Sequence, residues 1–191
     1  MESPRVADES VLVSRSVRLA EGVASFRTLL NAMERPRTVW TAPDEGGVVA
    51  GGAAATLTAN GAERFDRIRE AAQSLFASGD VHAGTEAARP RLFGGFSFHR
   101  EDRSPATGAP PSEESSGEAS ERAEGSPWAG FPDARFVFPR VQVTRTAGGP
   151  WLTVNAVGPE ASVERVESTL ADERDRLTGL PDTAPALPRP G

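Results

Sequence analysis

The sequence predicts an α/β protein of the α+β type, with a largely antiparallel sheet and two to three helices on one face. Apolar residues alternate in several short segments and recur at helical spacing in others. Helical segments separate the early strands, whereas a short turn joins late ones, so we expect the helices on one face of the sheet. The 191 residues are 38% hydrophobic, enough for one domain at residues 10–180, between a disordered N-terminus (1–9) and a proline-rich tail or linker (181–191).

The N-terminal elements follow from apolar spacing and one proline. Residues 10–19 alternate valine and leucine with polar residues, as a half-buried strand does. Residues 25–33 place apolar side chains three and four apart, which predicts a short helix. Pro36 breaks that helix, and residues 37–42 then read as a short strand.

The central elements begin with a glycine-rich stretch. Residues 46–59 predict a small-residue strand or a pair of strands, with glycines where neighbouring backbone approaches closely. A helix is predicted over residues 62–77, where apolar side chains recur with helical period. Asn60 is placed to cap its start, and Gly79 is expected as a left-handed residue after its end.

Three further strands and a helix complete the predicted domain. We expect strands at residues 91–98, 134–145 and 151–157, the last two joined by the turn "TAGGP". Apolar positions from Val163 to Leu177 then predict a second amphipathic helix.

The segment at residues 101–127 differs from the rest of the chain. It is dominated by serine, glutamate, proline and glycine, and it holds seven acidic residues and two arginines. Such a composition buries too little apolar surface to offset its ordering entropy, so we expect a disordered acidic surface insertion between two strands.

Composition excludes several kinds of chemistry. The chain has no cysteine and no lysine, and only two histidines, which excludes disulfides, zinc–thiolate sites, cysteine nucleophiles and any lysine base or Schiff base. Most of the net charge of −6 falls in the acidic insertion, and no basic stripe is present, so nucleic acid is not an expected partner. With no signal peptide or membrane span apparent, we expect a cytoplasmic protein; lysine depletion with excess acid would suit a halophile.

The stretch "RPRLFGGFSFHRED" offers the most suggestive chemistry. Ser97 resembles a nucleophile of the elbow type, but that pattern needs glycine two residues later and His99 stands there. His99, Glu101 and Asp102 could ligate a metal, yet they enter the expected disordered insertion, where ligands would not be preorganised. Gly94–Gly95 precedes no helix and is not a phosphate loop. We therefore interpret Ser97 as a strand residue and the two glycines as points of close backbone approach.

The other candidates have simpler structural explanations. His82 lies in a turn-like stretch and is expected to be exposed. Asp44 and Glu45 follow a proline, as turn residues do. A ligand platform is conceivable for the three tryptophans, but packing in the core or at a sheet edge is the commoner role. These tryptophans are Trp40, Trp128 and Trp151. The residues alone assign no catalytic, cofactor-binding or metal-binding position.

The order of three segments resembles the N-terminal half of isochorismate synthases, members of the chorismate-utilising family. In that family an aromatic-rich strand with a Pro-acid turn precedes a small-residue strand and a helix, and a "GGF-F" strand and an "FP-A-F-LPR" strand follow. The resemblance covers about residues 35–157. The matching segments here are "RPRTVWTAPDEGGVVAGGAAATLTANGAERFDRI", "RLFGGFSF" and "WAGFPDARFVFPRVQVTR".

The resemblance implies half of a chorismate-binding-enzyme sandwich, in which two similar sheets pack face to face with helices outside. It also implies chorismate and Mg²⁺ as substrate and cofactor of the complete enzyme, which adds water to the ring while a hydroxyl leaves, in menaquinone or siderophore biosynthesis. In isochorismate synthases a lysine, a glutamate and metal-binding glutamates of the C-terminal half perform this chemistry, so no catalytic residue is carried over to this lysine-free chain.

Two interpretations remain open. The chain is either the N-terminal portion of an isochorismate synthase, inactive without a C-terminal chorismate-binding half that is missing or on a separate chain, or a stand-alone binding or regulatory module with the same half-fold. An exposed Ser97 or His99 beside an ordered pocket would instead revive a hydrolase or a metal-binding protein.

Overall fold

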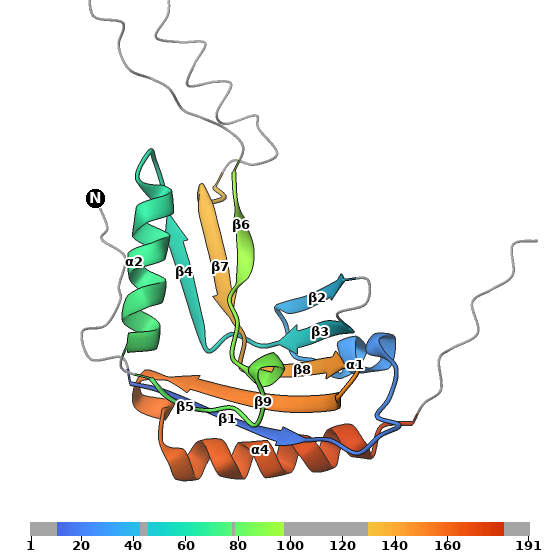
Figure 1. Cartoon of the computed structure of the whole chain (residues 1–191). Coiled ribbons are helices and arrows are strands. Elements are labelled where there is room, and N and C mark those ends of the chain that lie inside the picture. The colour runs from blue at the N-terminus through green and yellow to red at the C-terminus, as the bar shows by residue number, and fades with distance from the viewer. Residues whose placement is uncertain (1–10, 43–45, 78, 98–129, 182–191) are drawn as a thin grey trace, which may run out of the picture.

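The computed structural model describes residues 11–42, 46–77, 79–97 and 130–181. These residues form nine strands in two largely antiparallel sheets, together with three α-helices (Figure 1), which confirms the predicted fold class. The segments expected to be disordered at 1–9 and 101–127 lie outside the described residues. Within the described part of the chain, no helix has the length and apolar character needed to cross a membrane.

The elements have the following bounds. The strands are β1 (Leu12–Arg18), β2 (Arg37–Ala42), β3 (Gly46–Gly51), β4 (Ala55–Ala59), β5 (Asp80–His82), β6 (Phe93–Phe96), β7 (Ala134–Phe138), β8 (Val141–Thr146) and β9 (Gly149–Val157). The helices are α1 (Phe26–Ala32), α2 (Arg64–Ala77) and α4 (Val163–Thr178), with short 3-10 helices η1 (Glu86–Ala88) and η2 (Gly158–Glu160).

The larger sheet, sheet A, has the strand order β2-β3-β8-β9-β1-β5. Every neighbouring pair is antiparallel except β1 and β5, which are parallel. Helices α1 and α4 cover one face of sheet A. Alternate residues of each strand point toward these helices, and the main core forms between the sheet and the two helices. Its buried members are Val13, Leu19, Leu29, Met33, Val49, Val141, Val143, Leu152, Val154, Val166 and Leu177.

Helix α4 shows how local sequence and packing agree. The Ser162 hydroxyl accepts a hydrogen bond from the backbone N–H of Arg165 at 3.3 Å, which caps the first turn. Val166 and Leu177 are almost fully buried against sheet A. Each such side chain contributes about 1.5–3 kcal/mol by leaving water, so packing rather than capping holds the helix on the sheet.

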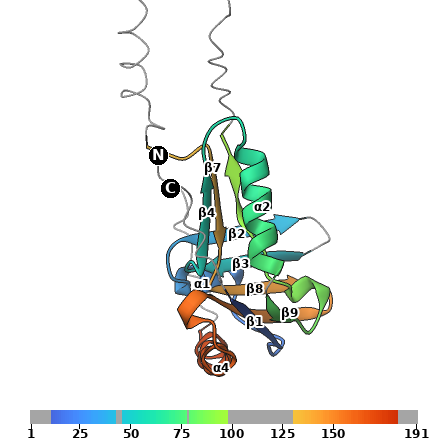
Figure 2. The ribbon, with the colours of Figure 1, turned by 90° about the vertical axis from the view of Figure 1, so that its left-hand side faces the viewer.

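The smaller sheet, sheet B, has the strand order β4-β7-β6 and its strands run across those of sheet A (Figure 1). Helix α2 packs against one face of it (Figure 2). Leu57, Ile68 and Ala134 form the core between helix and sheet. Leu12, Leu75 and Phe138 form a third cluster where α2, sheet A and sheet B meet. The two sheets and α2 therefore pack as a single unit.

The single strand predicted over residues 134–145 is wrong. The chain leaves sheet B after Phe138, turns at Pro139 and Arg140, and enters sheet A at Val141. Proline has no N–H to donate to a ladder, so it is placed at such a break rather than inside a strand. Of the strand predicted at 91–98, the described residues 91–97 form a strand only over β6. The strand at 37–42 and the turn joining β8 and β9 are confirmed.

Two further local expectations also fail. Residues 80–82 were expected in a turn but form β5, which pairs with β1 at the edge of sheet A. Gly79 does not have a positive φ, so it is not the left-handed residue predicted after α2. Both errors concern the same connection, whose conformation is set by pairing with β1, 67 residues earlier in the chain.

The two glycines of β6 have different roles. A Cβ atom added to Gly94 would lie 2.0 Å from the carbonyl oxygen of Arg135 and 2.6 Å from the Cα atom of Phe136. The prediction of close backbone approach is therefore confirmed for Gly94. It is wrong for Gly95, where an added Cβ atom would meet nothing within 4 Å.

Candidate functional site

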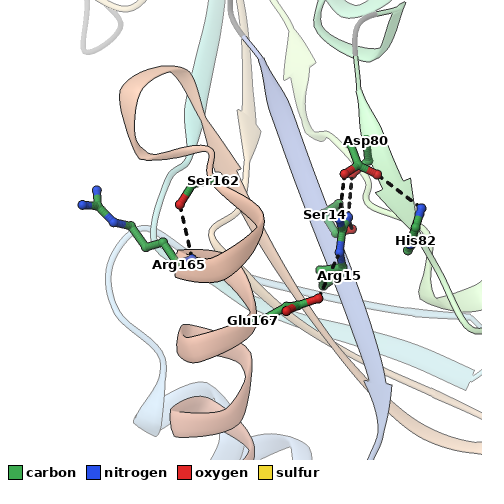
Figure 3. A network of polar contacts seen from close by, with 7 residues as sticks. All are labelled: Ser14, Arg15, Asp80, His82, Ser162, Arg165 and Glu167. Atoms are coloured by element: carbon green, nitrogen blue, oxygen red, sulfur yellow. Dashed lines mark hydrogen bonds and ion pairs between the residues drawn. The ribbon is translucent and has the colours of Figure 1, made fainter.

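A polar cluster lies where β5 joins the edge of sheet A (Figure 3). Parallel pairing places Arg15 opposite His82 and two pairs away from Asp80. The Arg15 guanidinium forms an ion pair with the Asp80 carboxylate at 2.6 Å, and its Nε atom lies 3.8 Å from a Glu167 carboxylate oxygen on α4. The Nε2 atom of His82 lies 3.3 Å from the second oxygen of Asp80. Three elements thus contribute charged side chains to one point.

Arg15 is the centre of this cluster. Its side chain is only 10% exposed, and it also donates hydrogen bonds to the backbone carbonyls of Ser14 and Asp80, both at 3.0 Å. The hydrogen bond from Arg15 lowers the pKa of the Asp80 carboxyl below its usual value, although burial acts in the opposite direction. Asp80 is therefore ionised at neutral pH and serves as a fixed anion beside Arg15.

The cluster is not assembled as a catalytic triad. An Asp–His pair orients a base when a nucleophile lies within reach of the imidazole, but the Ser14 hydroxyl donates instead to Asn155 at 2.7 Å. A shallow depression of about 530 Å³ lies elsewhere, between the end of β1 and the C-terminal end of α4. It is lined by Arg18, Leu19, Ala20, Arg174, Asp175, Thr178 and Gly179. The charged groups therefore fasten β5 and α4 to β1, and they do not line this depression.

A second polar junction surrounds Asp133, which immediately precedes β7. Its carboxylate accepts hydrogen bonds from the backbone N–H of Gly61 at 2.7 Å and from the Ser97 hydroxyl at 3.3 Å. The backbone also takes part, because Ser97 N–H donates to the Asp133 carbonyl at 2.6 Å and Asn60 accepts from Asp133 N–H at 2.9 Å. Asp133 thus ties together the ends of three segments at the tip of sheet B. Ser97 acts there as a hydrogen-bonded residue at the end of a strand.

The face of sheet A opposite the helices is polar but buried. Thr153 donates to the Ala88 carbonyl at 2.7 Å, and Gln142 donates to the Arg89 carbonyl at 3.1 Å, which holds the η1 segment across the sheet. Asn155 donates to the Pro139 carbonyl at 2.9 Å where the chain changes sheets. The buried donors named here all have a partner, as buried polar groups require, whereas the acceptor atom Oε1 of Gln142 lacks one. The polar layer is thus part of the scaffold.

The amino-acid sequence matches the model of one protein family, described as chorismate binding enzyme, over residues 3–189. The chain belongs to the chorismate-binding enzyme family. A search of curated proteins found no match.

Members of the chorismate-binding enzyme family are expected, from the resemblance above, to use Mg²⁺. The described residues contain no group of three or more histidine and acidic side chains able to hold a metal ion. Asp80, His82 and Glu167 come near one another, but the Arg15 guanidinium lies among them and repels a cation. The described part of this family member does not fit a magnesium site.

The structure places the remaining candidate residues apart from one another. His82 is exposed, with 74% of its side chain accessible. Trp40 is exposed on the edge strand β2, whereas Trp151 in β9 packs against the backbone of Gly84. Pairing puts the two tryptophans three strands apart in one row of sheet A, about 14 Å, so they do not form a shared platform. The candidates outside the described residues are His99, Glu101, Asp102, Asp44, Glu45 and Trp128.

The sequence did not single out Arg15, Asp80 or Asp133, which lie at the centres of the two polar clusters. For Asp133 a signal was present, because an acid after a proline between two strands is typical of a residue that bonds nearby backbone. For Arg15 and Asp80 the only signal would have been the parallel pairing of β1 and β5, which is not visible from local pattern.

Proposed function

We propose that this chain is the N-terminal scaffold portion of an isochorismate synthase, the enzyme that converts chorismate to isochorismate for menaquinone or siderophore biosynthesis. On this proposal the chain is inactive alone. A C-terminal chorismate-binding half, missing from this sequence or carried on a separate chain, supplies the lysine base, the glutamate acid and the glutamates that hold Mg²⁺.

One observation carries the proposal: a member of the chorismate-binding enzyme family has no lysine at any of its 191 positions. Addition of water to the chorismate ring requires a base to activate the water and an acid to protonate the leaving hydroxyl. In isochorismate synthases the resemblance assigns the base to a lysine, and arginine cannot replace it, because its guanidinium stays protonated in proteins.

The arrangement of the described residues supports a scaffold role. The charged cluster around Arg15 fastens an edge strand and a helix, and the cluster around Asp133 fastens the tip of sheet B. Neither borders the shallow depression near Arg18. The polar side chains of these two clusters are thus engaged in contacts within sheet A and within sheet B.

The test is an assay of isochorismate formation from chorismate and Mg²⁺, followed by chromatography of the products. We expect no turnover by the purified chain and measurable turnover after addition of a separately expressed C-terminal domain of an isochorismate synthase. That C-terminal domain alone is the matched control. Isochorismate formation by the isolated chain would overturn the proposal, as would a C-terminal domain whose activity the chain does not increase.

A further inference from the structure

Sheet B has two unlike faces. Alternation along its strands directs Leu57, Phe96 and Phe136 toward α2. No described helix lies against the opposite face, which Figure 2 shows on the side of the sheet away from α2. We call this surface the open face. The side chains and glycine on it are Thr56, Thr58, Phe93, Gly95, Arg135 and Val137.

The open face combines apolar and hydrogen-bonding groups. Thr56, Thr58 and Arg135 are exposed, whereas Phe93 and Val137 are half-buried. None of the six positions is acidic, and Arg135 forms no ion pair with any described residue. Asp133, at the end of the same strand, already accepts hydrogen bonds from Gly61 and Ser97. The face therefore presents one uncompensated positive charge beside apolar surface.

The outer edge of β6 is available for strand pairing. The hydrogen bond from Ser97 N–H to the Asp133 carbonyl shows which residues of β6 form hydrogen bonds with β7 and which do not. Antiparallel ladders alternate, so the N–H and C=O groups of Gly94 and Phe96 point away from β7. The described residues place no strand on that side. The edge also lacks the lysine, proline or bulge that commonly blocks strand addition.

No contact among the described residues explains the glycine at position 95. An added Cβ atom would contact nothing within 4 Å, and its φ is not in the left-handed region. Glycine inside a strand costs about 0.5–1 kcal/mol relative to alanine. The missing side chain leaves a flat place on the open face beside the free edge, where another chain can approach the backbone closely.

We propose that the open face and the free edge of β6 form the docking surface for the catalytic partner chain. The partner adds an extended segment beside β6, with a carboxylate that meets Arg135 and apolar side chains that cover Phe93 and Val137. Main-chain hydrogen bonds to Gly94 and Phe96 supply affinity, and the charge of Arg135 selects an acidic partner segment. This inference rests on the proposed function and adds the place at which the two chains meet.

Two substitutions test the surface without disturbing the fold. Gly95→Arg adds a long side chain at a position where the structure has room, and it stands in the path of the partner segment. Arg135→Glu reverses the charge of an exposed side chain that has no described ion pair. The matched control is Ala171→Arg, which adds the same side chain to an exposed position on α4. Thermal melts of the three variants alone establish that each is folded like the wild type.

The measurement is the affinity of each variant for the separately expressed C-terminal domain, from titrations that follow both complex formation and isochorismate formation. We expect Gly95→Arg and Arg135→Glu each to weaken binding at least tenfold, and Ala171→Arg to bind like the wild type. At saturating chain concentration, turnover by Arg135→Glu should return to the wild-type value, because the substitution affects docking and not chemistry.

The outcomes separate the two proposals. Wild-type affinity in both variants would overturn the docking surface and leave the proposed function intact. Failure of the wild-type chain to bind or activate the C-terminal domain would overturn the proposed function, and the docking surface with it. Sedimentation of the chain alone tests a second copy as the occupant. A wild-type dimer that Gly95→Arg dissociates would assign the edge to self-association and overturn the inference.

Discussion

Adding one methyl group at each of the two glycines of β6 should have opposite effects on the stability of the protein. In Gly94→Ala the new Cβ atom would lie 2.0 Å from the Arg135 carbonyl oxygen, more than 1 Å inside the optimal separation of roughly 3.5 Å. Both of its nearest contacts are backbone atoms of β7, which no rotamer change can relieve. Overpacking typically costs about 1–3 kcal/mol, and we expect about 3 kcal/mol here, because β6 must separate from β7.

The adjacent substitution Gly95→Ala is the matched control. Its Cβ atom meets nothing within 4 Å, so alanine only restricts the unfolded chain, and we expect a gain of about 0.5–1 kcal/mol. In a domain of this size 1 kcal/mol shifts the melting temperature by about 2–4 °C. Gly94→Ala should therefore melt about 6–12 °C below the wild type, and Gly95→Ala slightly above it.

Urea unfolding followed by tryptophan fluorescence measures both free energies in the same buffer. Equal stability of the two variants would refute the reasoning, since it would mean that β6 lies no closer to β7 at Gly94 than at Gly95. A loss in Gly95→Ala would also refute it, because the open face would then be covered by some part of the chain itself.

Three further predictions concern the core, the charged cluster and the insertion. Phe138→Ala should lose about 3–5 kcal/mol of unfolding free energy in urea, since Phe138 is fully buried and its ring packs edge-on against Phe76 with centroids 5.6 Å apart. An equal loss in Phe65→Ala would contradict this, because Phe65 is 52% exposed. Because folding lowers the pKa of Asp80, its contribution to stability is present above the unfolded carboxyl pKa of about 4 and is lost as the pH falls through the lower folded value. Asp80→Asn should thus be less stable than the wild type at pH 7 but nearly equal to it in acid, and a pH-independent difference would count against the ion pair. Deletion of residues 101–127 should leave the melting temperature within a few degrees, because Ser97 and Asp133 already join the flanking strands, and a drop of many degrees would show that the segment belongs to the core.

Much of the fold could be predicted from local pattern, because each helix buries one side and each long strand alternates. The strand at 37–42 was predicted with its observed bounds, since prolines lie on both sides of it. The division of residues 134–145 was missed although the sequence contains a signal. The buried positions change phase there, from Phe136 and Phe138 to Val141 and Val143, which means that the two parts belong to different sheets.

The polar clusters could not be predicted in the same way. Asp80 meets Arg15 only because a strand of three residues, too short to show alternation, pairs with β1. Asp133 receives hydrogen bonds from two segments that precede it by 36 and 72 positions. Contacts between such distant segments depend on how the sheets are assembled, and a single sequence contains no record of that assembly. The composition, by contrast, excluded lysine and cysteine chemistry directly, because the absence of these residues does not depend on the fold.

The position of β1 within sheet A constrains the order in which the protein can fold. This strand precedes every other described strand in the chain, yet its antiparallel neighbour is β9, which pairs Leu12 with Val157. On the ribosome β1 therefore emerges long before β9 exists, and only the short strand β5 is available to it in the meantime. Loop closure over such a separation is slow. Sheet A must be completed late, because β1 lacks its main partner until the residues up to Val157 have been made.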